Sequence, residues 1–507
     1  MKTLLSLAFL ISFVTIKAQS VTVDESFANS GVLINNNTSS FGDFALQSIG
    51  KIIVAGPQGK TINSLKNFII TRYNVDGSLD TGFGIKGYTG NGNNMAQVFT
   101  IAIQKDDAIV AVGRTTTDLK IVRFTKNGDL DKSFGKNGSV IFGAGKNAFS
   151  YIGGLVIQPD GKIVLCAYSI FSNYFKVGFL ARYLSDGKPD ESFGSGGATN
   201  WSFPDNENNF AATSLALQTN GQILVGWFYG DSSIIYRYNS NSDRDLTFGN
   251  NGTAHFQNSD NVVAGFKFSK LIIQPNGKII GAGYASDNAG KLYMAAGRLN
   301  SNGSIDDSFG NNGIQHISFT QKVSTIDGAA LQTDGKIIIA GTVKSSGATY
   351  AMARLTNNGD IDSDFGANGR LVTVTDKYSE CNGILLQLDN KILLGGNTGL
   401  STSNFLLIRY NNDVVKKQIV WESKPSDKNN FKINLSPNPA VNNLLIEGLT
   451  TNEKIKISVV DFAGNIKLQA VANSNTFNLN IASLKAGNYL LKVETNNSIT
   501  TKAFIKQ

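Results

Sequence analysis

The chain has 507 residues, of which 53 are glycine, and it holds only 2 histidines and 2 cysteines. This length indicates two or more domains, and the cysteine content excludes a disulfide-rich scaffold and a cysteine-based zinc cluster. The formal net charge of +8 is spread along the chain without a basic tract, so we expect no nucleic-acid partner.

Residues 1–18 have the pattern of a secretory signal peptide. Lys2 is followed by an apolar run over residues 4–14 and then by Ala18, a small residue in front of a polar stretch. We expect cleavage after Ala18. The run is too short to span a bilayer comfortably, and no later run reaches about 18 apolar residues, so we expect no transmembrane segment. The sequence therefore predicts an exported protein.

Repeats of one unit fill residues 19–410. The most regular phrase is Arg72-Tyr-Asn-Val-Asp-Gly-Ser-Leu-Asp80-Thr-Gly-Phe83-Gly84, in which aspartate follows arginine by eight residues and phenylalanine by eleven. The repeated arginines are Arg72, Arg123, Arg182, Arg237, Arg298, Arg354 and Arg409. The connector aspartates that follow them are Asp80, Asp131, Asp190, Asp245, Asp306 and Asp362.

A second phrase, such as Gln158-Pro-Asp-Gly-Lys-Ile-Val-Leu, precedes each arginine. Asp-Gly between two β-branched runs predicts a tight hairpin, because both turn residues need positive φ. Each unit of about 55 residues then holds four short strands, which is typical of a propeller blade. The hairpins and connectors should share one face, and the loops of variable length should lie on the other face, where binding usually resides.

The two ends of the repeat region explain each other. No connector follows Arg409, but a matching phrase, Asp24-Glu-Ser-Phe27-Ala-Asn-Ser-Gly31, stands near the N-terminus. A ring whose last connector comes from its first residues accounts for both observations, and closure protects edge strands. The sequence thus predicts an all-β fold, with a seven-bladed β-propeller over residues 19–410. A β-solenoid is the alternative, but it would not need the N-terminal phrase.

The repeats resemble the delta-60 repeat family of bacterial secreted and surface proteins. The resemblance rests on the arginine-to-glycine phrase, and it implies no established activity. The repeat departs from glycine at Ala28, Asp107, Ser242 and Asn390.

The tail forms a second predicted domain. Residues 411–432 are polar and indicate a linker, and residues 433–507 hold short strand-like runs with turns, typical of a small β-sandwich. This segment resembles the type A C-terminal sorting domain of the type IX (Por) secretion system of Bacteroidetes. The matching residues include Pro437, Asn438, Pro439, Asp461, Gly464, Gly487 and Tyr489. The resemblance implies periplasmic transit, the type IX machinery as partner, and a secreted or surface-attached product. A generic carbohydrate-binding sandwich is the alternative.

The repeated charged residues are candidates for structure rather than chemistry. A catalytic group is needed once, whereas one that recurs in every blade is usually framework, so we expect each arginine to pair with a connector aspartate. The aspartates match no calcium loop, and aspartates in turns commonly accept backbone hydrogen bonds. We expect His255 and His316 to be strand residues, and Cys166 and Cys381 to be buried thiols. No pattern indicates a resident metal or a cofactor.

Two functions fit the sequence. In the first, a non-enzymatic propeller binds a glycan or protein through its variable loops, which include Trp201-Ser-Phe-Pro-Asp-Asn-Glu-Asn-Asn-Phe210 and Tyr168-Ser-Ile-Phe-Ser-Asn-Tyr174. In the second, a propeller enzyme acts on glycans with carboxylates that converge on the central channel. The feature that discriminates between them is whether three or more acidic or polar residues from different blades cluster at the variable-loop face.

Overall fold

The computed structural model describes residues 21–35, 40–58, 67–90, 95, 97–115, 118–143, 148–171, 176–202, 210–229, 232–256, 265–287, 289–320, 322–344, 347–373, 375, 378–399, 404–412, 433–449, 454–460, 466–485, 487–495 and 499–506. The predicted signal peptide with Ala18, most of the predicted linker, and the motif residues Asp461 and Gly464 lie outside these ranges. The described residues form strands and turns and contain no helix that could span a membrane. Two compact units divide the chain at residues 416 and 417.

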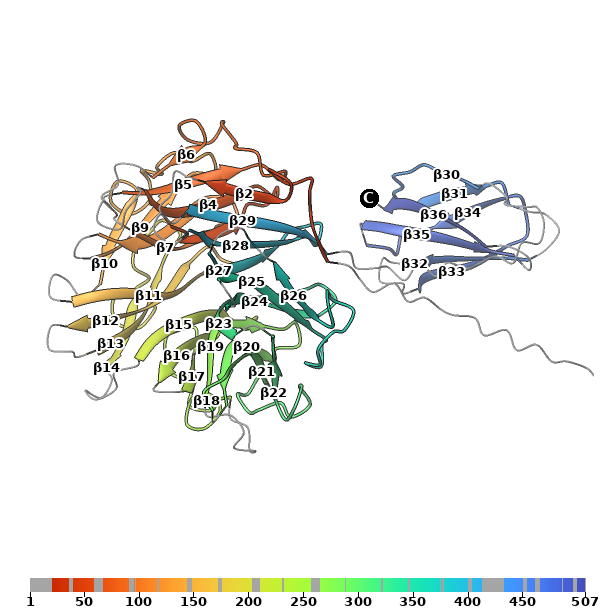
Figure 1. Cartoon of the computed structure of the whole chain (residues 1–507). Helices are drawn as coiled ribbons and strands as arrows, with labels where there is room; N and C mark the ends of the chain where they lie inside the picture. Colours follow the sequence, from red (N-terminus) through yellow and green to blue (C-terminus); the bar gives the residue numbers. More distant parts are fainter. Residues whose placement is uncertain are drawn as a thin grey trace, which may run out of the picture. The chain divides into compact units, whose positions relative to one another are not determined.

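The first unit is a β-propeller in which six blades are four-stranded antiparallel sheets (Figure 1). Blades 1 to 3 are β3 (Asp43–Leu46), β4 (Ile52–Gln58), β5 (Asn67–Tyr73) and β6 (Tyr88–Thr89); β7 (Gln97–Ile103), β8 (Ile109–Arg114), β9 (Leu119–Phe124) and β10 (Ser139–Phe142); and β11 (Ala148–Ile157), β12 (Ile163–Phe171), β13 (Lys176–Tyr183) and β14 (Ala198–Ser202). Blades 4 to 6 are β15 (Phe210–Leu217), β16 (Ile223–Tyr229), β17 (Ser232–Tyr238) and β18 (Thr253–His255); β19 (Gly265–Ile273), β20 (Ile279–Ser286), β21 (Leu292–Leu299) and β22 (Ile314–Ile317); and β23 (Lys322–Leu331), β24 (Ile337–Lys344), β25 (Ala348–Leu355) and β26 (Arg370–Thr373).

Blade 7 combines strands from both ends of the propeller. β27 (Ser379–Leu386), β28 (Ile392–Thr398) and β29 (Asn404–Asn411) are joined by the N-terminal strands β1 (Thr22–Val23) and β2 (Val32–Asn35). Both N-terminal strands pair with β29, with Val23 opposite Tyr410 and Val32 opposite Ile408. The seven-bladed propeller predicted from the sequence is confirmed. We call residues 21–35 the clasp.

The ring closes at the seam between blades 7 and 1. The first strand of each blade contacts the first strand of the next blade, and β27 contacts β3. The ring of Phe405 in blade 7 stacks on Phe41 before blade 1 with centroids 5.9 Å apart. Asn35 of the clasp donates from Nδ2 to the Tyr73 hydroxyl at 2.6 Å. Closure therefore joins residues at opposite ends of the repeat region.

The propeller core lies between the blades. The second strand of each blade is a run of aliphatic residues without polar alternation, as in Ile337, Ile338 and Ile339, none of which has exposed surface. Such a run fits a sheet that is covered on both faces by neighbouring blades. Clusters of these residues join successive blades, and the cluster that contains Ile339 also takes in Met294 of blade 5.

Positive φ is kept at the positions where the repeat departs from glycine. The φ angles are 46° at Ala28, 65° at Asp107, 81° at Ser242 and 65° at Asn390. The surrounding turns therefore impose the left-handed conformation even on residues with a Cβ, and the blade geometry survives each departure.

The second unit is a sandwich of two antiparallel sheets. One sheet contains β30 (Asn434–Ser436), β31 (Asn443–Glu447) and β34 (Thr476–Asn480), and the other contains β33 (Ile466–Ala472), β32 (Ile455–Val460), β35 (Gly487–Glu494) and β36 (Ile499–Lys506). Leu444, Ile446, Ile457 and Leu491 form part of the core between them and have no exposed surface. The β-sandwich expected from the sequence is confirmed.

Candidate functional site

The repeated arginines and aspartates meet on the face that carries the hairpins and connectors. In all seven blades the arginine donates from Nε to the aspartate of its own connector, at distances of 2.5 to 2.8 Å. Six of these pairs join residues eight positions apart. In blade 7, Arg409 instead reaches Asp24 of the clasp at 2.8 Å. The connector of the last blade thus comes from the N-terminus.

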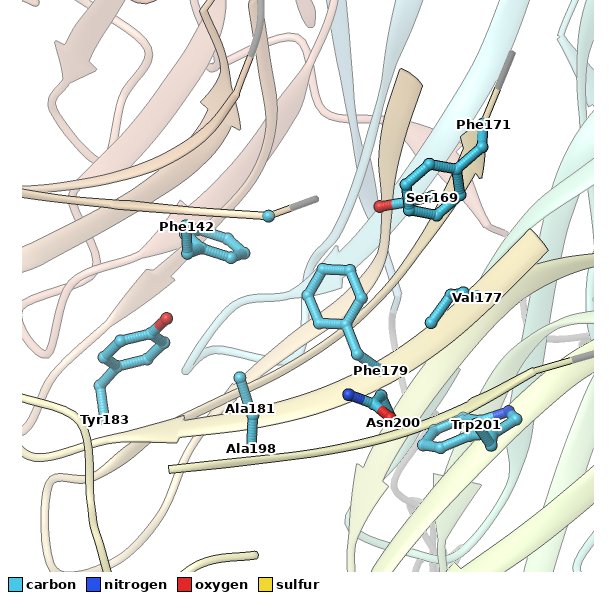
Figure 2. Close-up of a pocket in the computed structure, with 11 residues that line it drawn as sticks. Phe142, Ser169, Phe171, Val177, Phe179, Ala181, Tyr183, Ala198, Asn200 and Trp201 are labelled. Carbon is cyan, nitrogen blue, oxygen red and sulfur yellow. The ribbon is translucent and has the colours of Figure 1, made fainter. Parts of the chain in front are cut away.

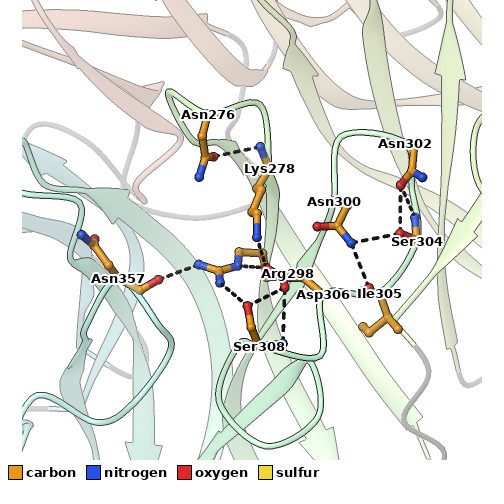
Figure 3. A network of polar contacts seen from close by, with 10 residues as sticks. All are labelled: Asn276, Lys278, Arg298, Asn300, Asn302, Ser304, Ile305, Asp306, Ser308 and Asn357. Atoms are coloured by element: carbon orange, nitrogen blue, oxygen red, sulfur yellow. Dashed lines mark hydrogen bonds and ion pairs between the residues drawn. The ribbon is translucent and has the colours of Figure 1, made fainter.

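Each guanidinium also binds the next blade and lies over a buried ring. In blade 5, Arg298 donates from Nη1 to the carbonyl oxygen of Asn357 at 2.6 Å (Figure 3). Its guanidinium carbon lies 4.7 Å from the centroid of the Phe309 ring. All seven arginines stack in this way, at 4.4 to 4.8 Å. Arginine suits this place because its planar group can stack and donate in two directions at once.

The connector aspartates use both carboxylate oxygens. Oδ1 of Asp306 accepts from the Ser308 hydroxyl at 2.7 Å, and Oδ2 accepts from Arg298 and from Lys278 at 2.7 Å. Burial alone would raise the pKa of Asp306, but the bonds from Lys278, Ser308 and Arg298 outweigh it and hold the pKa well below its usual value. The aspartate is therefore a carboxylate at neutral pH, saturated with partners.

In five blades a glycine follows the arginine by five residues and leaves room for the preceding blade, whereas Ser242 takes this place in blade 4. A Cβ built on Gly128 would lie 2.9 Å from the ring of Phe83, and φ there is +91°. Gly187, Gly303 and Gly359 meet the phenylalanine of their preceding blade in the same way. The phenylalanine side chain of the connector thus lies between its own arginine and the turn of the next blade.

We infer that this network, which we call the connector ring, is framework. Its charges are paired, its rings are buried, and each of its members recurs from blade to blade. Sequence reasoning missed two of its parts, the phenylalanine platform and the hairpin lysine that shares the aspartate. Both recur in register, so the signal was present in the sequence, but spacing alone does not reveal a stacked contact.

The first strands surround the propeller axis and carry a shared irregularity. Six of them have a bulge five residues before the hairpin glutamine, at Phe99, Gly153, Thr213, Ser269, Asp327 and Asn382. A bulge re-aims a side chain and interrupts the ladder. Both faces of these strands are covered by neighbouring blades, so the surface left exposed on them opens toward the axis.

The axis has one polar end and one apolar end. The residues seven positions before the hairpin glutamine of each blade are mostly polar: Ser40, Gln97, Tyr151, Ala211, Lys267, Thr325 and Glu380. The residues two positions before the same glutamine are aliphatic: Ala45, Ala102, Val156, Ala216, Ile272, Ala330 and Leu385. Each first strand runs toward its hairpin, so the polar end lies toward the variable loops. We call this end the axial mouth.

Ionisable groups from several blades gather near the axial mouth. Asp327 in blade 6 is accessible to solvent, but the surrounding protein partly desolvates it and raises its pKa, and the negative charge of Glu380 in blade 7 adds to the rise. Glu380 accepts a hydrogen bond from the Tyr378 hydroxyl at 2.6 Å. Desolvation also raises the pKa of Asp43 in blade 1, opposed by hydrogen bonds from the Ile101 N–H and the Thr100 hydroxyl and by the charge of Lys270 in blade 5.

The histidines and cysteines do not assemble. His255 and His316 lie on the outermost strands of blades 4 and 5, and burial lowers the pKa of both. Cys166 and Cys381 are buried free thiols in blades 3 and 7. Within the described ranges, no three His, Cys, Asp or Glu side chains are grouped so that they could hold a metal ion.

A groove opens between the outer strands of blades 2 and 3. It encloses about 550 Å³ and is lined from β10, β12, β13 and β14. Figure 2 shows the ring of Phe179 at the centre of the lining, with Phe142 and Val177 on either side of it in this view. Phe171 and Trp201, from the two aromatic variable loops singled out in the sequence, line this groove. The loop residues 172–175 and 203–209 lie outside the described residues.

Family comparisons match both units. Residues 47–83, 104–134, 158–193, 218–248, 274–309 and 332–365 match the family described as a domain of unknown function (DUF5122) β-propeller. Residues 434–507 match the secretion system C-terminal sorting domain. The chain is a DUF5122 propeller with a sorting tail. The seventh unit, which is split between the two ends of the propeller, lies outside the matched segments.

Three solved structures are similar to this chain at low identity. A catalytically inactive virginiamycin B lyase from Staphylococcus aureus is 15% identical with a TM-score of 0.43, covering 74% of this chain and 98% of its own. An ulvan lyase of polysaccharide lyase family PL25 is 12% identical with a TM-score of 0.44, covering 76% and 95%. PorZ, a surface component of the type IX secretion system of Porphyromonas gingivalis, is 9% identical with a TM-score of 0.24, covering 97% and 88%. No curated protein matches the sequence. These likenesses carry no argument about function.

Three of the sorting motif residues, Asn438, Gly487 and Tyr489, contact the last strand of the tail, β36. The Asn438 side chain accepts from the backbone N–H of Ile505 at 2.9 Å, and Ala440 donates to the Ile505 carbonyl at 2.8 Å. Tyr489 stacks on Phe504 with centroids 5.8 Å apart. Gly487 begins β35. Because residues 434–507 match the sorting domain, the DUF5122 propeller is a secreted or cell-surface protein handled by the type IX system through this tail.

Proposed function

We propose that the protein is an exported binding propeller that holds an extracellular glycan or protein at the axial mouth. One observation carries the proposal, namely the polarity of the axis, which is charged toward the variable loops and aliphatic toward the hairpins. A ligand that enters from the variable-loop side meets Asp327, Glu380 and Lys267. On the opposite face, the connector ring has already used its charges within the framework.

The axial mouth carries charges of both signs, which favours binding over catalysis. Lys267 and Lys270 stand on blade 5, whereas the carboxylates stand on blades 6, 7 and 1. A rigid ring holds these side chains at fixed separation, which limits the entropy lost when a ligand binds. Such a site suits a ligand with hydroxyl and ionic groups distributed around it.

A glycan-array and protein pull-down screen of the mature protein tests this proposal. The variant D327N/E380Q should lose binding at least tenfold, because two ionic hydrogen-bond acceptors become neutral amides. The matched control D307N removes an exposed carboxylate on the connector face and should bind as the wild type does. Equal loss of binding in the mouth variant and the control would contradict the proposal.

A second candidate function is glycan hydrolysis at the same mouth. The observation that favours it is the pair Asp327 and Glu380, in which the neighbouring charge and desolvation raise the pKa of Asp327. A protonated Asp327 could donate to a leaving oxygen while Glu380 activates water. A screen for new reducing ends tests it. Turnover that E380Q abolishes without loss of binding would replace the binding proposal with this one.

A further inference from the structure

The groove between blades 2 and 3 lies beside Phe142, the last residue of β10, and the strand β13 of the next blade. β10 ends at Phe142, whereas the facing strand β13 extends over eight residues from Lys176 to Tyr183. The Phe142 ring contacts Phe179 and Tyr183 with centroids 6.3 and 6.0 Å away. Val177, near the other end of β13, lines the groove together with these rings. The inner part of the interface between blades 2 and 3 is packed, and its outer part forms the groove.

The open part combines aromatic rings with uncharged hydrogen-bonding groups. Phe171 and Phe179 are half-buried, so part of each ring meets solvent, and Asn200 is exposed. Figure 2 shows the Asn200 amide among the aromatic side chains. The Ser169 hydroxyl is buried and bonds to the Ser150 hydroxyl at 2.6 Å, so Asn200 supplies the polar groups for a ligand. The C–H bonds of a pyranose ring carry partial positive charge and lie well against the negative face of an aromatic ring, while an amide binds sugar hydroxyls.

The charge of the wall indicates which glycans fit. Within the described part of the chain, no Asp, Glu, Lys or Arg lines this groove. By contrast, a cavity between blades 5 and 6 has Lys291 and Arg370 in its wall. A buried carboxylate or sulfate would lie unpaired in the groove and would cost more than its contacts return. The volume of about 550 Å³ lies inside the range of roughly 300–1,000 Å³ that small-molecule sites occupy.

We propose that the groove between blades 2 and 3 is a binding site for a short neutral oligosaccharide, with Phe171 and Phe179 as stacking platforms and Asn200 as the hydrogen-bonding group. This site lies on the outer strands, away from the axial mouth. It extends the proposed function by adding a second site and by naming its ligand class, and it does not depend on the mouth.

Titration calorimetry of the mature protein tests the proposal with cellohexaose, laminarihexaose, maltohexaose and xylohexaose, and with hexagalacturonic acid as the charged comparison. At least one neutral hexasaccharide should bind, and hexagalacturonic acid should bind at least tenfold more weakly. The fluorescence of Trp201, which lines the groove, should change on binding. Absence of heat with every neutral hexasaccharide at millimolar concentration would overturn the proposal.

Variants separate this site from the axial mouth. V177W fills the groove and should abolish binding, and N200A, which removes an exposed amide, should weaken it about fivefold. L388A, at an 82% exposed residue on the hairpin face, should bind as the wild type does. D327N/E380Q should also retain groove binding, so the two proposals fail separately. Unchanged affinity in both V177W and N200A, with wild-type thermal unfolding, would overturn the assignment.

Discussion

The clasp makes the stability of the whole ring depend on one N-terminal carboxylate. Asp24 is 4% exposed and accepts from Arg409 and Lys391, each at 2.8 Å. The variant D24N keeps the size of the side chain and removes the charge. Arg409 then remains buried at 3% exposure without its counter-ion. Breaking a buried pair costs roughly 3–5 kcal/mol, and the amide oxygen can still accept one hydrogen bond, so we expect a loss of about 3 kcal/mol.

Thermal unfolding of the mature protein measures this loss. A decrease of about 3 kcal/mol corresponds to a fall of roughly 4 °C in the unfolding midpoint for a domain of this size. The matched control is E25Q, which removes the same charge at the next residue, where the side chain is exposed. E25Q should unfold within about 1 °C of the wild type, as surface substitutions usually do.

The pH dependence of the same variant tests the cause. Burial tends to raise the pKa of Asp24, but hydrogen bonds from Lys391 and Ser26 and the charge of Arg409 hold it well below its ordinary value of 3.8. A lowered folded-state pKa contributes stability that is full above 3.8 and is lost as the pH falls toward the folded-state value. The difference in unfolding midpoint between the wild type and D24N should therefore be largest at neutral pH and should decrease below pH 4. A gap that does not change with pH, or equal midpoints for D24N and E25Q, would refute the reasoning.

Two further predictions concern the packing of the blades. In a denaturation assay, G128A should destabilise the propeller by about 3 kcal/mol, because alanine would be strained at φ +91° and its Cβ would meet the Phe83 ring. The control G196A, at φ +60° with open space around it, should cost only about 1 kcal/mol in the same assay. Burial raises the pKa of the Cys166 and Cys381 thiols to about 12, so neither should react with a disulfide reagent at pH 8 in the native protein, and both should react once it is unfolded. Rapid reaction of either thiol in the native protein would contradict the second prediction, and an equal loss of stability in the two glycine variants would contradict the first.

The fold could be predicted from the sequence because it is repeated and is governed by local turn chemistry. Asp-Gly turns fix the hairpins, and the displaced phrase at Asp24–Gly31 identifies the closed ring, since only a ring needs a connector from the other end of the chain. The sandwich of the tail followed from its strand spacing and its motif. In the propeller, the decisive contacts lie within one repeat or at a position that the repeat defines.

The candidate sites could be predicted only in part, because they depend on geometry that the repeat does not encode. The sequence placed binding on the variable-loop face, but it did not reveal that bulges set Asp327 and Asn382 at the axis. The groove depends on how blades 2 and 3 pack together, as in the contact of Phe142 with Phe179, and the spacing of the repeat does not reveal that contact. The role of Phe83 and its equivalents was also hidden, since a recurring ring does not show which neighbour stacks on it.

Hydrogen exchange with bound ligand tests the central claim most directly, namely that the variable-loop end of the axis binds and that the connector ring is framework. The mature protein would be compared with and without the strongest ligand from the array screen. Protection should rise in peptides that cover the starts of β23 and β27, around Thr325 and Glu380, and should not change in the connector peptides around Asp80 and Asp306. New protection in the connectors, with none at the starts of the first strands, would contradict the account.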